Sequence, residues 1–406
     1  MRLRRLASVI TASLLLTSCG GGALNLTEGG IGGSGYSIGS ITAFGSIWVN
    51  GVRYDVSQAQ FIRDGSIASG QNDYRIGELV TIGGFVNADG VSGTATSVEF
   101  KDALEGSVTA SSRDGSTITV MGKTILTDAL SVFHGFTLLT DLQYGNVVEI
   151  SGRYDANGLL KATSITLLQT SFTPNESMLE VKGFISNVDL AAQTFDLDQL
   201  IIDYSAASLD LPNNTPANGQ YVEVKSLQAL RNTTLIASEV GLESEYQQFD
   251  EGQELELEGL VTALISSAQF TVNGQSVETN AGTRFEYGTA NDIVLNALIE
   301  VEGQINVNGI LIAEEVSLKQ SGQTDAVELE GPITMINQAT QEITLQGVTV
   351  LIDGSTSLQS EVNDQETSIQ FSDLQLNDFV EVDGTRLSNG SILALRIERE
   401  FPGEDD

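Results

Sequence analysis

Glu105-Gly106-Ser107-Val108-Thr109 and Glu258-Gly259-Leu260-Val261-Thr262 are two copies of the segment that decides the fold of this chain. In each copy a glycine is followed by residues that favour β-strands. Further copies are centred on Gly39, Gly183 and Gly331, so that successive glycines lie 67 to 77 residues apart. Self-similarity at a nearly fixed period indicates a tandem repeat. The sequence therefore predicts five copies of one short β-rich unit.

Each copy contains five strand-like pieces in the same order. The second piece ends in a pair such as Asn50-Gly51 or Asn273-Gly274, which is typical of a tight hairpin because its turn needs positive φ. Before the fourth piece, residues such as 138–142 and 371–374 predict a single helical turn. Five strands with a short helix at that place indicate a small OB-like barrel, which closes its sheet and leaves few edges.

We therefore expect an all-β fold, a tandem array of five small OB-like five-stranded β-barrels after a lipoprotein signal peptide and a Gly-rich tether. The period exceeds the ~40–50 residues of a propeller blade, so each repeat is expected to fold on its own. A β-sandwich made by pairing repeats is the alternative. The expected repeats span residues 38–102, 103–170, 178–245, 254–320 and 326–400, followed by an acidic tail at 401–406.

The first residues have the pattern of a bacterial lipoprotein leader. Residues 1–18 contain three arginines, an apolar run from Val9 to Leu16, and the sequence Leu16-Thr17-Ser18 before Cys19. This pattern predicts a signal peptide that is cleaved before Cys19, which is then acylated. The apolar run is too short to span a bilayer, and residues 19–37, rich in Gly and Ser, read as a flexible tether. Because Gly20 and not Asp follows the cysteine, we expect attachment to the outer membrane, with the barrels facing the periplasm or the cell surface.

Two features resemble a known family. One is the glycine-rich segment 29–35 that leads into the strand and turn of residues 41–51. The other is the recurring strand Gly-x-x-Val-Glu-Val-x-Gly. Together they resemble proteins that carry repeats of the domain of unknown function 5666. The resemblance implies tandem small β-barrels in a bacterial lipoprotein, and it implies no activity. The third repeat departs most, because Ser226 stands where the other copies have glycine.

The charge of the chain is strongly negative. It has 19 Lys and Arg against 54 Asp and Glu, a net charge of −35. Such a field repels phosphate backbones and favours solubility, so the composition predicts no nucleic acid partner. The expected partners are the membrane, through the lipid at Cys19, and an unknown envelope protein or polysaccharide. A single cysteine excludes an intrachain disulfide.

No motif for catalysis is present in the sequence. His134 is the one histidine, and a triad would also need a partnered nucleophile and an acid. The pattern Gly30-x-Gly32-x-x-Gly35 matches a dinucleotide motif by its letters, but a β-strand and not a helix is expected after it. The sequence predicts that the protein is not an enzyme and needs no organic cofactor.

Glutamates alternate with apolar residues in the first and fourth strands, as in Leu255-Glu256-Leu257-Glu258. Alternation places the leucines toward the core and the glutamates on the outer face. Strands one and four are neighbours in an OB-type barrel, so these glutamates can pair, and clustered carboxylates can bind Ca²⁺. The alternative is a solvated acidic face without metal. The candidate ligands are Glu105, Glu149, Glu180, Glu223, Glu256, Glu300, Glu328 and Glu381.

Trp48 is the lone tryptophan and replaces an outward threonine of the other repeats. It is expected either to cap the tether or a neighbouring barrel, or to contact a partner. The sequence as a whole predicts a non-enzymatic envelope lipoprotein, an extended acidic rod that acts as a spacer or as a binding array for a protein or polysaccharide. The alternative function is a Ca²⁺- or oligosaccharide-binding module.

Overall fold

The computed structural model describes residues 34–400, apart from 45, 89, 113–115, 129, 245–246, 320–325, 355, 363–364 and 387–390. The regular elements of this part are β-strands and short 3-10 helices. No helix in the described ranges is long and apolar enough to cross a membrane. The leader, Cys19 and the acidic tail lie outside the described residues.

The strands of unit 2, residues 104–169, show how each barrel closes. The first strand pairs with the second and the second with the third. The third runs parallel to the fifth, the fifth pairs with the fourth, and the fourth returns to the first. This order, 1-2-3-5-4-1, is that of an OB-type barrel. The elements are β8 (Leu104–Ser111), β9 (Thr117–Val120), β10 (Lys123–Leu126), β11 (Val132–His134), η2 (Leu139–Asp141), β12 (Val147–Tyr154) and β13 (Leu160–Gln169).

The other units repeat this order of pairing. Unit 1 contains β1 (Ser34–Ala43), β2 (Ile47–Val49), β3 (Val52–Asp55), β4 (Gln60–Arg63), β5 (Ser66–Ile67), η1 (Gln71–Asp73), β6 (Leu79–Val86) and β7 (Ser92–Phe100). Unit 3 contains β14 (Leu179–Asp189), β15 (Thr194–Leu197), β16 (Leu200–Asp203), β17 (Ser208–Asp210), η3 (Pro212–Asn214), β18 (Tyr221–Ser226), β19 (Thr234–Ile236) and β20 (Glu239–Leu242).

Unit 4 contains β21 (Glu254–Ser266), β22 (Gln269–Val272), β23 (Gln275–Glu278), β24 (Arg284–Glu286), η4 (Ala290–Asp292), β25 (Leu298–Ile305) and β26 (Leu311–Leu318). Unit 5 contains β27 (Ala326–Asn337), β28 (Glu342–Leu345), β29 (Val348–Leu351), β30 (Ser357–Val362), β31 (Gln365–Ser368), η5 (Phe371–Asp373), β32 (Phe379–Arg386) and β33 (Ile392–Glu400). The prediction of an all-β chain of tandem OB-like barrels is confirmed, and the helical turn expected before the fourth strand is present in units 2 and 5.

Local sequence explains the hairpins. In β9, Ile118 and Val120 are buried while Thr117 and Thr119 are half-exposed, so the alternation points one face into the core. The turn that follows has φ of 46° at Met121 and 80° at Gly122. Positive φ at both central residues matches the right-handed twist of the flanking strands, and the chain therefore folds back directly into β10.

The fourth strand carries a glycine where the sheet bends. A Cβ on Gly152 would lie 2.3 Å from the carbonyl oxygen of Lys161, and the register with β13 shifts between Ser151 and Gly152. In unit 3 the equivalent residue is Ser226, whose Oγ donates a hydrogen bond to the carbonyl oxygen of Ile236 over 2.6 Å. The fifth strand of that unit is divided into β19 and β20. Unit 3 thus keeps the order of pairing but interrupts the strand at this point.

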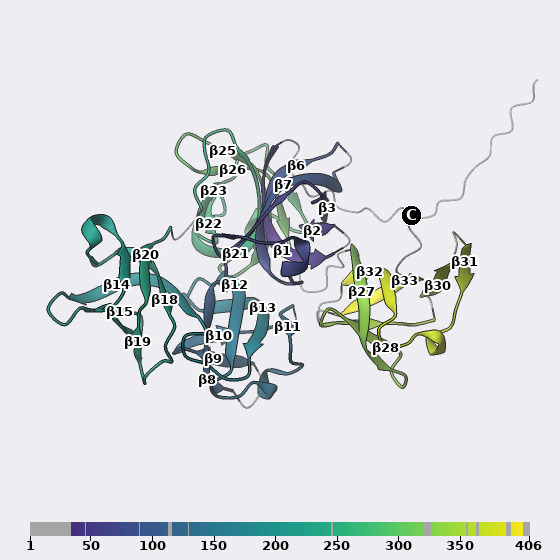
Figure 1. The fold of residues 1–406 in the computed structure, drawn as a ribbon. Coiled ribbons are helices and arrows are strands. Elements are labelled where there is room, and N and C mark those ends of the chain that lie inside the picture. Colours follow the sequence, from purple (N-terminus) through teal and green to yellow (C-terminus); the bar gives the residue numbers. More distant parts are fainter. Residues whose placement is uncertain are drawn as a thin grey trace, which may run out of the picture.

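The units join through their first strands. Residues 35–38 of β1 pair in parallel with residues 254–257 of β21, which links units 1 and 4. Leu104 and Glu105 of β8 pair antiparallel with residues 180–181 of β14, which links units 2 and 3. Figure 1 shows the two crossing strands β1 and β21, with units 2 and 3 on one side of them and unit 5 on another. We name these contacts the 1–4 seam and the 2–3 seam.

The prediction of an extended rod is therefore wrong. Unit 1 is hydrogen-bonded to unit 4, because the first part of β1 pairs with β21 and the later part of β1 pairs with β2. For the same reason β1 begins at Ser34, inside the stretch expected to be tether. The buried apolar residues of units 1 and 5 also form one continuous cluster. The repeats, which the sequence predicts to follow one another in an extended rod, instead form a cluster and contact one another.

Candidate functional site

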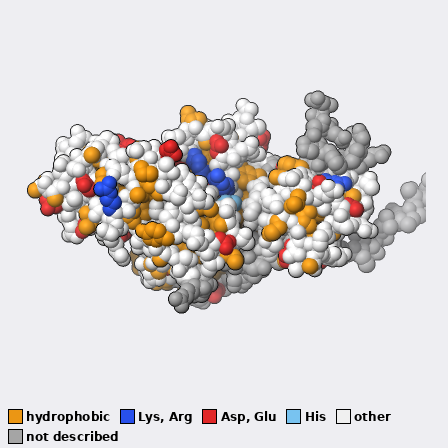
Figure 2. Space-filling view, turned by 60° about the horizontal axis from the view of Figure 1, so that its bottom comes forward, with side chains coloured by type: hydrophobic (Ala, Val, Ile, Leu, Met, Phe, Trp, Pro, Cys, Tyr) orange, Lys and Arg blue, Asp and Glu red, His pale blue; other side chains and the backbone are white. Residues whose placement is uncertain are grey.

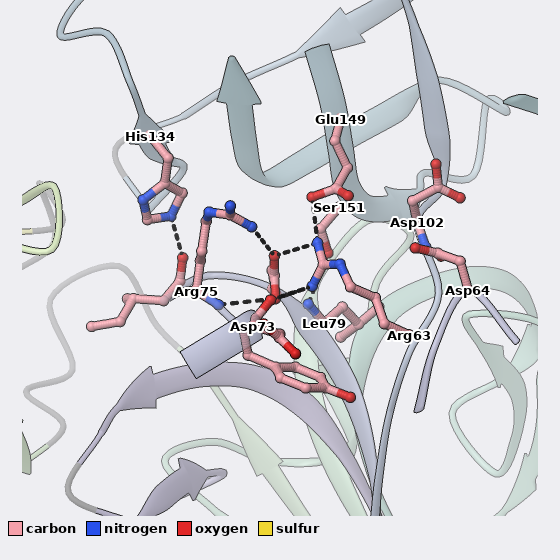
Figure 3. A network of polar contacts seen from close by, with 12 residues as sticks. Arg63, Asp64, Asp73, Arg75, Leu79, Asp102, His134, Glu149 and Ser151 are labelled. Atoms are coloured by element: carbon pink, nitrogen blue, oxygen red, sulfur yellow. Dashed lines mark hydrogen bonds and ion pairs between the residues drawn. The ribbon is translucent and has the colours of Figure 1, made fainter. Parts of the chain in front are cut away.

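The contact between units 1 and 2 is a network of charged and polar groups, drawn in Figure 3. Arg63 on β4 lies 2.9 Å from Glu78 and 2.7 Å from Glu149 of unit 2. The backbone N–H of Leu79 donates to Ser151 Oγ over 2.8 Å. Burial raises the pKa of Glu149, and the neighbouring Arg63 opposes that shift. The arginine thus supplies the positive charge that allows two acidic barrels to meet.

His134 belongs to the same contact. Its Nε2 lies 2.8 Å from the carbonyl oxygen of Ile76 in unit 1, and burial lowers the pKa of its imidazole. Figure 2 shows Lys and Arg side chains gathered next to the histidine in a hollow of the surface. A neutral imidazole that donates to a backbone carbonyl binds two units together, which is a structural role.

Lys182 makes the corresponding contact for unit 3. Its Nζ lies 2.8 Å from Asp102 and 2.7 Å from Glu180. Carboxylate oxygens of Asp64, Asp102 and Glu180 lie within 4.8 Å of one another, a spacing that suits a cation. Burial would raise the pKa of Glu180, but Lys182 and the hydrogen bonds around it lower that pKa to about 2. The ammonium group therefore occupies the place between these carboxylates that a metal ion would take.

Arg153 joins three units. It extends from β12, is 7% exposed, forms an ion pair with Glu258 of unit 4, and lies 3.3 Å from Ser40 of unit 1 through Nη2. Its Nε is buried and has no hydrogen-bond partner among the described residues. Lys123 of unit 2 reaches Asp198 of unit 3 at 2.5 Å in the same way. Several of the few cations of this acidic chain, among them Arg63, Arg153 and Lys123, therefore form ion pairs between units.

A groove of about 830 Å³ opens between units 1, 2, 3 and 4. We call it the junction groove. Its lining combines apolar, aromatic, amide and paired charged groups, contributed by all four units and by the segments that connect them. Its lining includes Ile38, Thr81, Asp102, Lys123, Arg153, Tyr154, Lys182, Phe184, Tyr221, Gln247, Phe249, Leu257, Asn273 and Gln275.

Aromatic side chains form part of the groove wall. Phe184 and Tyr221 of unit 3 pack edge to face, with ring centroids 5.0 Å apart. Phe184 remains 48% exposed. Phe249, from the segment before unit 4, packs against Tyr36 at 5.3 Å. The groove therefore presents accessible aromatic surface beside hydrogen-bonding groups.

Amide side chains lie between these rings and the charged pairs. Gln247 accepts a hydrogen bond of 3.2 Å from Thr81 Oγ1, which holds the connecting segment against unit 1. Gln275 donates over 2.8 Å to the carbonyl oxygen of Gly309. Asn273 accepts from the backbone N–H of Leu260 over 2.9 Å. These groups are fixed by the barrels that carry them, so the groove is largely formed before a ligand arrives.

The predicted glutamates are placed in rows across the strands. Glu105 lies directly opposite Glu149 on one side and Glu180 on the other. In unit 4, however, Glu256 lies opposite Glu302, while Glu300 lies opposite Glu258. Glu223 is opposite Lys182, and Glu381 is opposite Glu330 and pairs with Arg396 at 2.8 Å. Glu328 is opposite Asp383, and its side chain lies outside the described part of the structure.

The expectation that these glutamates form a solvated face is wrong for four of them. Glu149, Glu180, Glu256 and Glu300 are all buried, because the outer face of one barrel is covered by the next unit. Burial, with Glu149 and Glu180 nearby, raises the pKa of Glu105 to about 8. The Ca²⁺ hypothesis stays untested for all eight glutamates.

Trp48 is half-buried on β2, and its indole Nε1 is buried without a hydrogen-bond partner among the described residues. Whether it caps a neighbour or contacts a partner stays open. Sequence reasoning missed Ile38, Leu257 and the aromatic pair Phe184 and Tyr221, since nothing in a single repeat indicates which units become neighbours. The signal that was available is the position of the rare cations, such as Arg153.

These features define a protein of tandem OB-like barrels, joined edge to edge, with a groove at the junction. The chain belongs to the family described as "Domain of unknown function (DUF5666)". The family model matches residues 37–99, 105–166, 258–317 and 330–398. It leaves unmatched the stretch of unit 3, where Ser226 replaces the glycine of the fourth strand. No curated protein matches the chain.

Two solved structures are similar to parts of the chain. One is described as "drosophila Unr CSD456", with 15% identity and a TM-score of 0.14, over 53% of this chain and 97% of that one. The other is a multidomain protein with nucleic acid binding domains from Streptococcus pneumoniae, with 12% identity and a TM-score of 0.12, over 58% of this chain and 76% of that one. At these TM-scores the likeness carries no argument about what this chain binds.

The prediction of no nucleic acid partner rested on net charge alone, and it is withdrawn. Net charge describes the whole surface, whereas a binding site is a local arrangement of groups. The overall charge of −35 is therefore not sufficient to exclude a class of ligand.

Proposed function

We propose that this chain is a non-enzymatic lipoprotein of the bacterial envelope that binds an oligosaccharide in the junction groove. The observation that carries the proposal is the groove itself, about 830 Å³ in volume and lined by four units together with exposed aromatic surface at Phe184. Its volume lies within the ~300–1,000 Å³ of ligand pockets in general. OB-type barrels often bind oligosaccharides on an open face of the sheet, and here the groove lies where such barrels meet.

The chemistry of the lining suits a ligand rich in hydroxyl groups. An aromatic ring such as Phe184 offers an apolar surface that can pack on the C–H face of a sugar. Amides such as Asn273 and Gln275 supply donors and acceptors nearby. Lys123 and Lys182 already lie within 3 Å of carboxylates, so their charge is largely compensated. This combination favours a neutral oligosaccharide.

A binding role rather than catalysis is proposed from the same lining. Among the described residues that form the groove there is neither histidine nor cysteine. His134, the one histidine of the chain, is held by the carbonyl oxygen of Ile76 and does not line the groove. Catalytic acid–base groups need to reach a reacting atom, and two acids of the groove, Asp102 and Asp198, are engaged by lysine.

The envelope location is proposed from the sequence pattern at Cys19. Acylation there would anchor the chain, and the glycine- and serine-rich residues that follow would hold the cluster of barrels away from the bilayer. Incorporation of an alkyne-labelled palmitate into the wild-type protein in Gram-negative cells, and its loss in Cys19→Ala, tests this part. Label retained in the variant would contradict acylation at Cys19.

The binding proposal is tested by isothermal titration calorimetry of residues 20–406 at pH 5.5 with linear neutral oligosaccharides. We expect saturable binding that Phe184→Ala weakens about tenfold, which corresponds to ~1.4 kcal/mol of lost stacking and burial. The matched control is Phe85→Ala, another exposed phenylalanine, which lies outside the groove lining and should leave the affinity unchanged.

Two outcomes would overturn the proposal. One is equal weakening by both phenylalanine variants, because the ligand would then not lie in the groove. The other is a lack of heat with every oligosaccharide tried. A single-stranded oligonucleotide is included as a competitor, and saturable binding of that probe lost in Phe184→Ala would assign the groove to nucleic acid instead.

A further inference from the structure

The 1–4 seam contains a carboxyl group with no access to water. Glu256 on β21 is 0% exposed, and Ser37 Oγ on β1 donates a hydrogen bond of 2.6 Å to its Oε2. Ser37 in turn accepts a hydrogen bond of 3.3 Å from Asn50 Nδ2. Glu256 Oε1 is buried and has no hydrogen-bond partner among the described residues. An ionised carboxylate left in this state is strongly disfavoured, whereas a neutral acid is tolerated.

The groups that face Glu256 do not compensate a negative charge there. Glu302 on β25 lies directly opposite it in the strand register, and Glu300 on the same strand acts on it more strongly. Tyr54 on β3 of unit 1 is fully buried and is also within the field of Glu256. The charge of Lys319, after β26, opposes the rise in the pKa of Glu256, but Lys319 pairs with Glu300 at 3.1 Å.

The surroundings of Glu302 extend the same negative field. Glu315 on β26 lies opposite Glu302 and pairs with Arg284. Burial, followed by Glu315 and Glu300, raises the pKa of Glu302 to about 8. Glu254 on β21 and Glu314 on β26 also contribute to that shift. Ionising Glu256 would therefore place one more negative charge in a buried and already acidic cluster.

The position of Glu256 connects this chemistry to the junction groove. Ser37 and Glu256 form one register pair of the seam, and Ile38 and Leu257 form the next. Ile38 and Leu257 both line the groove. The described strand pairing between units 1 and 4 is four residue pairs long, so a change at Glu256 acts on a short contact that is also part of the groove wall.

We propose that the 1–4 seam is a pH-dependent contact, closed while Glu256 is protonated and opened when Glu256 ionises. That this contact regulates the groove rests on the proposed binding function. Burial, followed by Glu300, raises the pKa of Glu256 well above its ordinary value. A raised pKa in the folded state means that the seam is fully stable at acid pH. That stability is lost as the pH rises through the raised value.

The proposal is tested by small-angle X-ray scattering of residues 20–406 between pH 5.5 and 9.5. We expect the radius of gyration of the wild-type protein to rise reversibly with pH as units 1 and 4 separate. Glu256→Gln keeps the size and removes the ionisation, so its radius of gyration should stay at the acid value throughout. The control Glu314→Gln removes an exposed glutamate of β26 and should behave as wild type.

Glu256→Met serves as a second variant, because it fills a similar volume without any polar atom and should also remain closed. The comparison needs only one of the two variants, Glu256→Gln or Glu256→Met, to fold at pH 5.5. A wild-type radius of gyration that does not change with pH, or one that rises equally in the Glu256 variants, would overturn the proposal.

Oligosaccharide binding is measured separately at pH 5.5, where the seam is closed. A flat scattering profile with intact binding rejects only the seam. Opening of the seam without any oligosaccharide binding rejects only the proposed function.

Discussion

Ile38 of unit 1 and Leu257 of unit 4 are register partners in a parallel strand pair, and both residues line the junction groove. They are 219 residues apart in the chain and belong to barrels that could each close without the other. Hydrogen bonding between first strands therefore does two things. It covers an edge that would otherwise be open to other chains, and it forms part of the groove wall.

The 2–3 seam should weaken as the pH rises, because Glu105 has a folded-state pKa of about 8 against an ordinary 4.5. Between these values the folded state holds a proton that the unfolded chain has lost, so stability falls with increasing pH. We expect Glu105→Gln to stabilise the protein by roughly 1–3 kcal/mol at pH 8.5 and to have little effect at pH 4.5. Urea denaturation at both pH values measures this, and equal effects at both would contradict it.

Arg153 and Glu258 should be strongly coupled, because their ion pair is largely buried between units 2 and 4. Arg153→Met alone leaves the glutamate without its partner and should cost about 2–4 kcal/mol. The double variant Arg153→Met/Glu258→Gln should lose less than the sum of the single variants. Chemical denaturation of all four proteins gives the coupling energy. Additive losses would show that the pair is not coupled, and exposed Arg231→Met is the control for loss of an arginine.

Lys182 should act as a built-in cation for Asp64, Asp102 and Glu180. We expect Lys182→Ala to lower the melting temperature, since it leaves buried carboxylates unpaired. Millimolar Ca²⁺ should then raise the melting temperature of the variant more than that of the wild type, by binding to the folded state. Thermal melts with and without Ca²⁺ check this, with exposed Lys101→Ala as control. Equal Ca²⁺ shifts in wild type and variant would show that the ammonium does not occupy this place.

Gly152 should tolerate no side chain, because a Cβ there would lie 2.3 Å from the carbonyl oxygen of Lys161. We expect Gly152→Ala to destabilise unit 2 by about 1–3 kcal/mol through overpacking against the backbone. Gly241, which has no atom within 4 Å of the equivalent position, is the control, and Gly241→Ala should change stability by less than about 0.5 kcal/mol. Denaturant titrations of both variants measure the free energy of unfolding. Similar losses of stability in the two variants would contradict the close approach at Gly152.

Part of the candidate site could be anticipated from the sequence. Alternation in Leu255-Glu256-Leu257 correctly directed the leucines inward, and the OB order brought Glu105 opposite Glu149 as expected. Unit 4 has the same register, with Glu258 opposite Glu300, so that Glu256, two residues earlier on the first strand, meets Glu302 instead. Strand order follows from the fold class, but register depends on where each hairpin turns and where the sheet bulges.

The sequence by itself determined the repeat, the all-β class and the closure of each barrel. These features depend on local patterns, such as the alternation in β9 and the turn at Met121 and Gly122, which every unit contains within about 70 residues. Only the tertiary structure decided that unit 1 joins unit 4, that Glu256 is buried, and that Phe184 lines a groove. The physical reason is that alternation identifies the face that points away from a barrel's own core. It does not determine whether water or another barrel covers that face.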